Sequence, residues 1–441
     1  MPEAKRSELT VRQERAILVG TILPGEDHGG EGPLDELERL AETAGAKTVG
    51  RHTQKLSHVD PRTYIGQGKA EELRDLCLAL DADAVLCDHD LSPAQIRNLE
   101  RITETKVVDR SELILDIFAT RAKTRQARIQ VELAQFEYTL PRLTKMWSHL
   151  DRHGGGVGTR GPGERQIESD RRAIARRMRD IRRELKDIAD RKQREVAARR
   201  EEFKACLVGY TNAGKSTLLR ALTGAEAFIE DRLFATLDTK TRAWALDPHH
   251  KALLSDTVGF IRRLPHHLVA SFHATLEEAN EADLLLHIVD ISHADCVHQA
   301  ETVRDVLARI GCGETPVLLV FNKCDIARPT VEAELLAATS RDHIRTSALR
   351  GDGLDELRER VLERVMSRET RLTVRAHCGN GRLLAYLHSQ AHVLSTATEG
   401  ETVVVEARIE PRHLHGLRAL AGPEDSVLLH NAPVPSEGAE P

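Results

Sequence analysis

The stretch GYTNAGKS, residues 209–216, matches the pattern GxxxxGK[ST] and decides which fold this chain contains. An apolar run typical of a buried strand, ACLVG (205–209), leads into it, and a helical pattern, TLLRALTG (217–224), follows it. In such a loop the backbone N–H groups point inward at phosphate oxygens, and the start of the helix favours negative charge. A chance glycine turn would not need both flanks, so we predict a P-loop domain that binds a nucleotide.

Lys215 and Ser216 end this loop with the side chains that a nucleoside triphosphate requires. The Lys215 ammonium is predicted to reach the β- and γ-phosphates, and the Ser216 hydroxyl to ligate Mg²⁺. The residues predicted to bind the nucleotide here are Gly209, Tyr210, Thr211, Asn212, Ala213, Gly214, Lys215, Ser216 and Thr217.

Three later motifs follow in order, each beside an apolar run. The motif DTVG starts at Asp256, which can hold Mg²⁺ through water, and ends at Gly259, whose N–H can sense the γ-phosphate. The motif NKCD ends at Asp325, which suits the guanine N1 and N2 donors, whereas adenine would leave its acceptors unpaired. A backbone N–H of the motif SAL, which starts at Ser347, can meet guanine O6. The predicted guanine-nucleotide contacts are Asp256, Thr257, Val258, Gly259, Asn322, Lys323, Cys324, Asp325, Ser347, Ala348 and Leu349.

The segment FATLD lies between the phosphate loop and Asp256, where a switch threonine, Thr236, would complete the Mg²⁺ shell. Its predicted nucleotide contacts are Phe234, Ala235, Thr236, Leu237 and Asp238. The predicted metal ligands are therefore Ser216, Thr236 and Asp256. The predicted catalytic residues are Lys215, Thr236 and Gly259.

Phe260 follows Gly259 at the position where Ras-like GTPases often place the glutamine that orients the attacking water. Phenylalanine can neither donate nor accept that hydrogen bond. We expect slow hydrolysis that a partner accelerates, unless another residue or the substrate itself positions the water. Asn212 also leaves two interpretations open, because it either helps to hold a K⁺ ion near the phosphates or only shapes the turn. Comparing hydrolysis rates in K⁺ and Na⁺ distinguishes these two roles.

The rest of the chain predicts further regions around this domain, within an α/β fold class. Strand and helix patterns alternate through residues 1–110, which indicates a small parallel α/β subdomain. Residues 111–203 have apolar positions spaced three and four apart in highly charged helices, which indicates an antiparallel helical hairpin. Residues 204–367 form the P-loop G domain with a parallel sheet, and residues 368–441 a small α+β domain with a tail.

The glycine-rich stretch GGGVGTRGPGE (154–164) contains the GxGxxG spacing of dinucleotide-binding folds. An amphipathic helix precedes it where such a fold needs a strand, so we place it at the tip of the hairpin. From Arg160 to Arg200 the chain has 15 Lys or Arg against 8 Asp or Glu. This excess favours contact with RNA phosphates, or else belongs to a solvated coiled-coil surface with i,i+4 pairs. The predicted RNA contacts at the tip are Arg152, Arg160 and Arg165.

Composition excludes several other classes of protein. With 441 residues, of which 40% are apolar and 30% charged, the chain is long enough for several globular cores. Its seven cysteines form no CxxC pair, which argues against a disulfide framework or a zinc site. It shows no apolar leader and no apolar run of about 18 residues, so we expect a cytoplasmic protein with no membrane contact.

Five segments are informative together: YIGQGKAEEL from Tyr64, the run from Val108 to Leu143, the glycine-rich tip, FATLD and the run that begins DTVGF. They resemble the HflX family of ribosome-associated GTPases, over about residues 15–370. The resemblance implies that the N-terminal region and the arm bind the large (50S) ribosomal subunit, at 23S rRNA near the peptidyl transferase centre. It also implies that hydrolysis is stimulated by the ribosome. DTKTR from Asp238 departs from the family's usual DPTTR, and the last part of the chain matches only loosely.

We therefore predict a monomeric GTPase that uses GTP or GDP and Mg²⁺ and that splits or rescues stalled 70S ribosomes. In the alternative, GTP gates a large-subunit assembly or anti-association factor, and hydrolysis only drives its release. A tRNA-modification GTPase is a third interpretation, which Asn212 permits. However, the sequence shows neither a cysteine site nor a folate-type site to accompany it.

Overall fold

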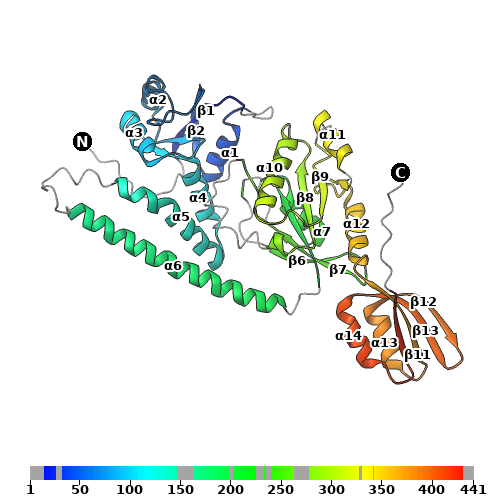
Figure 1. Cartoon of the computed structure of the whole chain (residues 1–441). Helices are drawn as coiled ribbons and strands as arrows, with labels where there is room; N and C mark the ends of the chain where they lie inside the picture. Colours follow the sequence, from blue (N-terminus) through cyan, green and yellow to red (C-terminus); the bar gives the residue numbers. More distant parts are fainter. Residues whose placement is uncertain are drawn as a thin grey trace, which may run out of the picture.

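The computed structural model describes residues 14–25, 32–146, 162–197, 202–224, 233–234, 240–262, 278–326, 330–340 and 342–430. Its strands form three sheets that follow one another along the chain (Figure 1). Among the helices of these residues, none is both long and apolar enough to cross a membrane.

The N-terminal sheet is parallel, with the strand order β2-β1-β3-β4. Side chains of its strand β1 alternate between two cores, because Ile17 packs with α2 and α3 whereas Leu18 packs with α1 and α4. Burial on both faces explains why β1 and β3 appear as short apolar runs. The elements are β1 (Arg15–Ile22), α1 (Asp35–Ala44), β2 (Lys47–Lys55), α2 (Gln67–Leu80), β3 (Ala84–Cys87), α3 (Pro93–Thr103) and β4 (Lys106–Val108).

The helical hairpin has the predicted apolar seam, where Ile129 and its neighbours on α5 pack against Met178 and its neighbours on α6. Ion pairs also join the two helices, as between Arg177 and Glu132 at 2.8 Å. Carboxylates of α5 thus neutralise part of the excess positive charge of α6. Helix α6 is about 54 Å long at 1.5 Å per residue. The elements are α4 (Arg110–Arg121), α5 (Arg125–Met146) and α6 (Pro162–Ala197).

The central sheet has the order β10-β9-β8-β5-β7-β6 and is parallel except at one edge, where β6 runs antiparallel to β7. The sequence patterns missed β6, because its residues KTRAWA are mostly exposed and only Trp244 among them is buried. Strands β5, β7 and β9 end at Gly209, Asp256 and Asn322, so three motifs meet at one edge of the sheet. The elements are β5 (Phe203–Gly209), α7 (Lys215–Thr223), β6 (Lys240–Ala245), β7 (Lys251–Asp256), β8 (Leu284–Asp290), α10 (Cys296–Arg309), β9 (Val317–Asn322), α11 (Val331–Thr339), β10 (His343–Arg345) and α12 (Leu354–Met366).

The C-terminal sheet is antiparallel, with the order β12-β13-β11-β14. Its element order βαββαβ is that of the ferredoxin-like motif, and Leu372 of β11 is buried against Leu387 of α13 and Leu417 of α14. The α/β fold class, with a final α+β region, is confirmed. The elements are β11 (Thr370–His377), α13 (Gly381–Gln390), β12 (Ala391–Glu399), β13 (Thr402–Ile409), α14 (Pro411–Leu420) and β14 (Ser426–His430).

Candidate functional site

The loop between β5 and α7 is shaped by two glycines that a larger residue could not replace. A Cβ atom on Gly209 would lie 2.4 Å from the Ile288 carbonyl oxygen, and one on Gly214 would lie 2.2 Å from Asn322 Nδ2. Gly214 also has a φ of +95°, in the left-handed region that favours glycine. The Asn322 amide donates to the Ala213 carbonyl oxygen at 2.9 Å, so the end of β9 supports the loop.

Lys215 begins α7 and is buried. Its Nζ donates to the carbonyl oxygens of Gly209 at 3.0 Å and Tyr210 at 2.7 Å. Burial lowers the pKa of Lys215 to about 8, and the attraction of Asp256 opposes only part of that effect. Because burial disfavours the charged form of Lys215, a phosphate that binds beside the ammonium stabilises this charge strongly.

Nucleotide affinity should therefore fall as the pH rises above the Lys215 pKa of about 8. Below that pH the amine already carries its proton, whereas above it binding must take up a proton, because phosphates raise the pKa of the amine. We expect the Kd for GDP to rise by up to about tenfold per pH unit above this point. Titration of labelled GDP between about pH 7 and pH 9 measures the effect. Lys215→Arg, whose guanidinium stays charged, should not show it, and an equal slope in both proteins would contradict this explanation.

A hydroxyl and a carboxylate meet next to the loop. Ser216 Oγ donates to Asp256 Oδ2 at 2.6 Å, and Asp256 is fully buried at the end of β7. Hard oxygen atoms of this kind are the ligands that Mg²⁺ prefers, so these two residues fit the ion. The third predicted ligand, Thr236, lies outside the described residues, as do Ala235, Leu237 and Asp238.

Asp325 is oriented by a hydrogen bond from the motif that follows it. Ser347 Oγ donates to Asp325 Oδ1 at 2.6 Å, and this bond keeps the pKa of Asp325 below its usual value. The Ala348 N–H donates to Asn322 Oδ1 at 3.0 Å, which ties the two motifs together. An ionised carboxylate beside this loop can accept two hydrogen bonds from one ligand edge.

The segment after Gly259 is paired with the phosphate loop. The Phe260 N–H donates to the Gly209 carbonyl oxygen at 3.1 Å, and the Thr211 N–H donates to the Phe260 carbonyl oxygen at 2.7 Å. A Cβ atom on Gly259 would lie 2.7 Å from Thr211 Cγ2 and 3.0 Å from Lys215 Nζ. The Phe260 side chain is 2% exposed within the core and offers no polar atom that could orient water.

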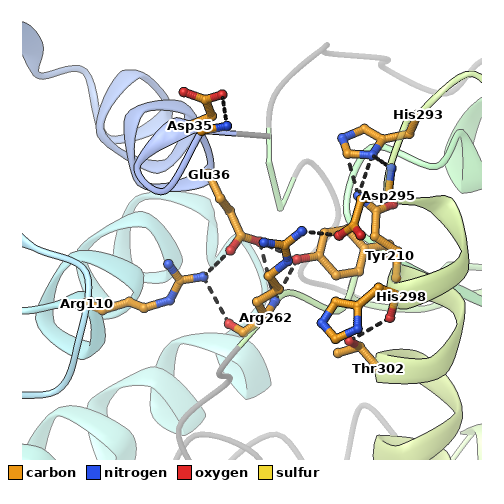
Figure 2. A network of polar contacts seen from close by, with 11 residues as sticks. Asp35, Glu36, Arg110, Tyr210, Arg262, His293, Asp295, His298 and Thr302 are labelled. Atoms are coloured by element: carbon orange, nitrogen blue, oxygen red, sulfur yellow. Dashed lines mark hydrogen bonds and ion pairs between the residues drawn. The ribbon is translucent and has the colours of Figure 1, made fainter. Parts of the chain in front are cut away.

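A polar network that the sequence patterns did not reveal joins this segment to the N-terminal region (Figure 2). The Tyr210 hydroxyl donates to Glu36 of α1 and accepts from the Arg262 N–H at 2.7 Å. Arg110 of α4 donates to Glu36 at 2.6 Å, to Asp88 at 2.7 Å and to the Arg262 carbonyl oxygen at 2.9 Å. These residues are far apart along the chain, so no local pattern could have grouped them.

Opposite charges face each other in this network, because the buried Arg110 guanidinium pairs with the carboxylates of Glu36 and Asp88. Burial alone would raise the pKa of Glu36, but Arg110 and the Tyr210 hydroxyl hold this pKa below its usual value. Burial raises the pKa of Tyr210 well above its usual value, so its hydroxyl stays a hydrogen-bond donor. Removing one partner would leave a buried charge uncompensated, which is strongly destabilising.

Comparisons with known proteins agree with this geometry. Residues 31–119, 121–199 and 204–323 match family models described as GTP-binding GTPase N-terminal, GTP-binding GTPase Middle Region and 50S ribosome-binding GTPase. A protein named GTPase HflX from Lacrimispora saccharolytica is 48% identical over 355 residues, covering 79% of this chain and 82% of the relative. The chain belongs to the HflX family.

Other HflX relatives are similarly close. Proteins named GTPase HflX from Caldanaerobacter subterraneus and Escherichia coli are 46% and 42% identical, covering 82% and 79% of this chain and 83% of each relative. Membership of the HflX family confirms the predicted resemblance, and with it GTPase activity and the binding of GTP and GDP.

Some of the predicted site residues lie outside the described residues, and the others lie in described strands, loops and helices. Arg152 and Arg160 fall outside the described residues, and Arg165 lies in α6 without a described side chain. Phe234 is 2% exposed and packs edge-on against Phe118 of α4, with ring centroids 4.7 Å apart. The remaining predicted residues lie in the described loops and helix start of the G domain; they are Thr211, Asn212, Thr217, Thr257, Val258, Lys323, Cys324 and Leu349.

Proposed function

We propose that this HflX GTPase binds the large (50S) ribosomal subunit and splits or rescues stalled 70S ribosomes in a GTP-dependent way. The observation that carries the proposal is the match of residues 204–323 to the model described as 50S ribosome-binding GTPase. The long hairpin with its positive excess supports it, because basic side chains release counterions when they meet RNA phosphates. The protein would act as a monomer in the cytoplasm.

In this proposal the nucleotide lies along the edge where β5, β7 and β9 end. Residues 209–217 hold the phosphates, Ser216 and Asp256 hold Mg²⁺ together with Thr236, and Asp325 accepts from guanine. The 2.6 Å contact between Ser216 Oγ and Asp256 Oδ2 supports the metal assignment, because the two oxygen atoms lie close enough to bind one ion. Asn212, with a φ of +62°, either holds K⁺ beside the phosphates or only forms the turn.

The arm supplies the RNA contacts in this proposal. Arg152, Arg160 and Arg165 flank or belong to the glycine-rich tip, where small residues allow the backbone to approach a crowded surface. The target would be 23S rRNA near the peptidyl transferase centre. Residues 1–110, 111–203, 204–367 and 368–441 would serve as the α/β subdomain, the arm, the GTPase domain and the C-terminal domain.

Sucrose gradients with a non-hydrolysable GTP analogue test the proposal. We expect the protein to convert 70S ribosomes into subunits and to sediment with 50S, because only the triphosphate form would hold the large subunit. Arg160→Glu with Arg165→Glu should remain at the top of the gradient, because like charges repel RNA phosphates. Sedimentation with free 50S subunits but no loss of 70S would support the assembly or anti-association alternative instead. Sedimentation with no ribosomal particle would contradict both.

A further inference from the structure

The carboxyl ends of β3 and β4 point at the GTPase domain. Open α/β sheets bind their ligands at this edge. Asp88 directly follows β3, and Arg110 lies two residues after β4. In this protein the edge contacts the GTPase domain of the same chain, because Arg110 donates to the backbone carbonyl oxygen of Arg262 at 2.9 Å (Figure 2).

Two segments that the N-terminal region contacts belong to the nucleotide site. Tyr210 is the second residue of the phosphate loop, and Arg262 is three residues beyond Gly259. The Tyr210 hydroxyl links them, since it accepts from the Arg262 N–H at 2.7 Å and donates to Glu36. The network therefore joins the phosphate loop to residues 259–262, and its hydrogen bonds depend on the distance between these two segments.

In the structure, residues 259–262 pack against the phosphate loop. The backbone bonds of Phe260 with Gly209 and Thr211 hold it there, and the Cβ direction of Gly259 points to within 3.0 Å of Lys215 Nζ. A γ-phosphate that bonds both Lys215 and the Gly259 N–H would lie beside this close approach. GTP would therefore bring an additional charged group to this contact, whereas GDP, which lacks the γ-phosphate, would not.

Helix α4 also contacts the start of the other switch segment. Phe118 of α4 meets the Phe234 ring edge-on at 4.7 Å, and Leu233 is buried in the same cluster. Arg110, at the start of this helix, holds the segment that follows Gly259. The single helix α4 thus touches both segments whose positions depend on nucleotide in GTPases.

We propose that the buried Arg110–Glu36 pair is a latch that holds residues 259–262 on the phosphate loop, so that GTP binding opens it and GDP binding leaves it closed. Linkage requires the converse as well: whatever moves α1 and α4 away from the loop raises the affinity for GTP relative to GDP. The inference rests on GTP binding by the loop and not on ribosome binding, so it is tested without ribosomes.

Glu36→Gln and Tyr210→Phe weaken the latch from its two ends. Glu38→Gln is the matched control, because Glu38 lies two residues away on α1 and its carboxylate pairs with Arg51. Titrations of the full chain with labelled GDP and a labelled non-hydrolysable GTP analogue give the ratio of the two Kd values. We expect this ratio to shift toward the GTP analogue by about tenfold in each latch variant, as befits a lost hydrogen bond to a charged group, and not in the control.

Two further measurements separate a latch from a purely structural contact. The double variant should shift the ratio no more than the larger single variant, because both changes open one device. In the wild type, hydrogen exchange of peptides covering residues 259–262 should rise with the GTP analogue relative to GDP. A lowered melting temperature with an unchanged ratio would overturn the proposal, and so would equal exchange in the two nucleotide states.

Discussion

Asp325→Asn is expected to weaken GTP binding by roughly 10³-fold or more, in line with sites that recognise a ligand through hydrogen bonds. The carboxylate of Asp325 is already oriented by Ser347 at 2.6 Å and has a lowered pKa, so it is ionised at neutral pH. An asparagine amide keeps one acceptor but directs N–H donors at the guanine N1–H or N2 group. When two hydrogen-bond donors face each other, neither has an acceptor, and this makes binding less favourable in a partly closed site.

Xanthosine triphosphate should reverse this loss, because its position 2 carries a carbonyl oxygen that an amide N–H can meet. Competition titrations with GTP and xanthosine triphosphate measure both affinities. Asp352→Asn is the control, since Asp352 has an exposed side chain in the loop just beyond Leu349. GTP affinity that survives in Asp325→Asn, or no gain for xanthosine triphosphate, would show that Asp325 does not face the base.

The sequence predicted the parts of the fold that depend on local patterns. The P-loop and the motifs at Asp256 and Asn322 could be placed at strand ends, because buried parallel strands are short apolar runs and the motifs directly follow them. The seam of the hairpin could be predicted for the same reason, since its apolar spacing is set by the helix repeat. The edge strand β6 was not predicted, because it buries only Trp244 and its other residues are exposed or half-buried.

Contacts between distant residues could not be predicted from one sequence. Arg110 and Glu36 are separated by 74 residues, and Tyr210 and Glu36 by 174. A buried arginine at the start of a helix looks the same in sequence as an exposed one, because its burial depends on which carboxylates the fold brings to it. The position of Phe260 inside the core likewise depends on how the segment lies on the loop.

The second large effect concerns the rate of hydrolysis. The Phe260 ring is 2% exposed and its N–H and carbonyl groups are bonded to the phosphate loop, so this residue cannot orient the attacking water. We expect the protein alone to hydrolyse GTP slowly. In our proposal the 50S subunit repositions the switch segments or supplies charge to the transition state, a contribution worth about 10³–10⁵ in rate in known GTPases.

A partner that only repositions groups already present would give a smaller acceleration, so we set the lower bound at about tenfold, which corresponds to about 1.4 kcal/mol of barrier. The subunit matters because the family model matched by residues 204–323 names the 50S particle. The small subunit has no corresponding support and is therefore the control particle.

Phosphate release from GTP, measured with the protein alone, with 50S subunits and with 30S subunits, tests the central claim most directly. Parallel reactions in K⁺ and Na⁺ test Asn212, and Lys215→Ala supplies the background of contaminating hydrolysis. We predict a rate with 50S subunits at least about tenfold above both the protein alone and the 30S mixture. Equal rates in all three mixtures would contradict the account of this HflX protein as a GTPase activated by the large ribosomal subunit.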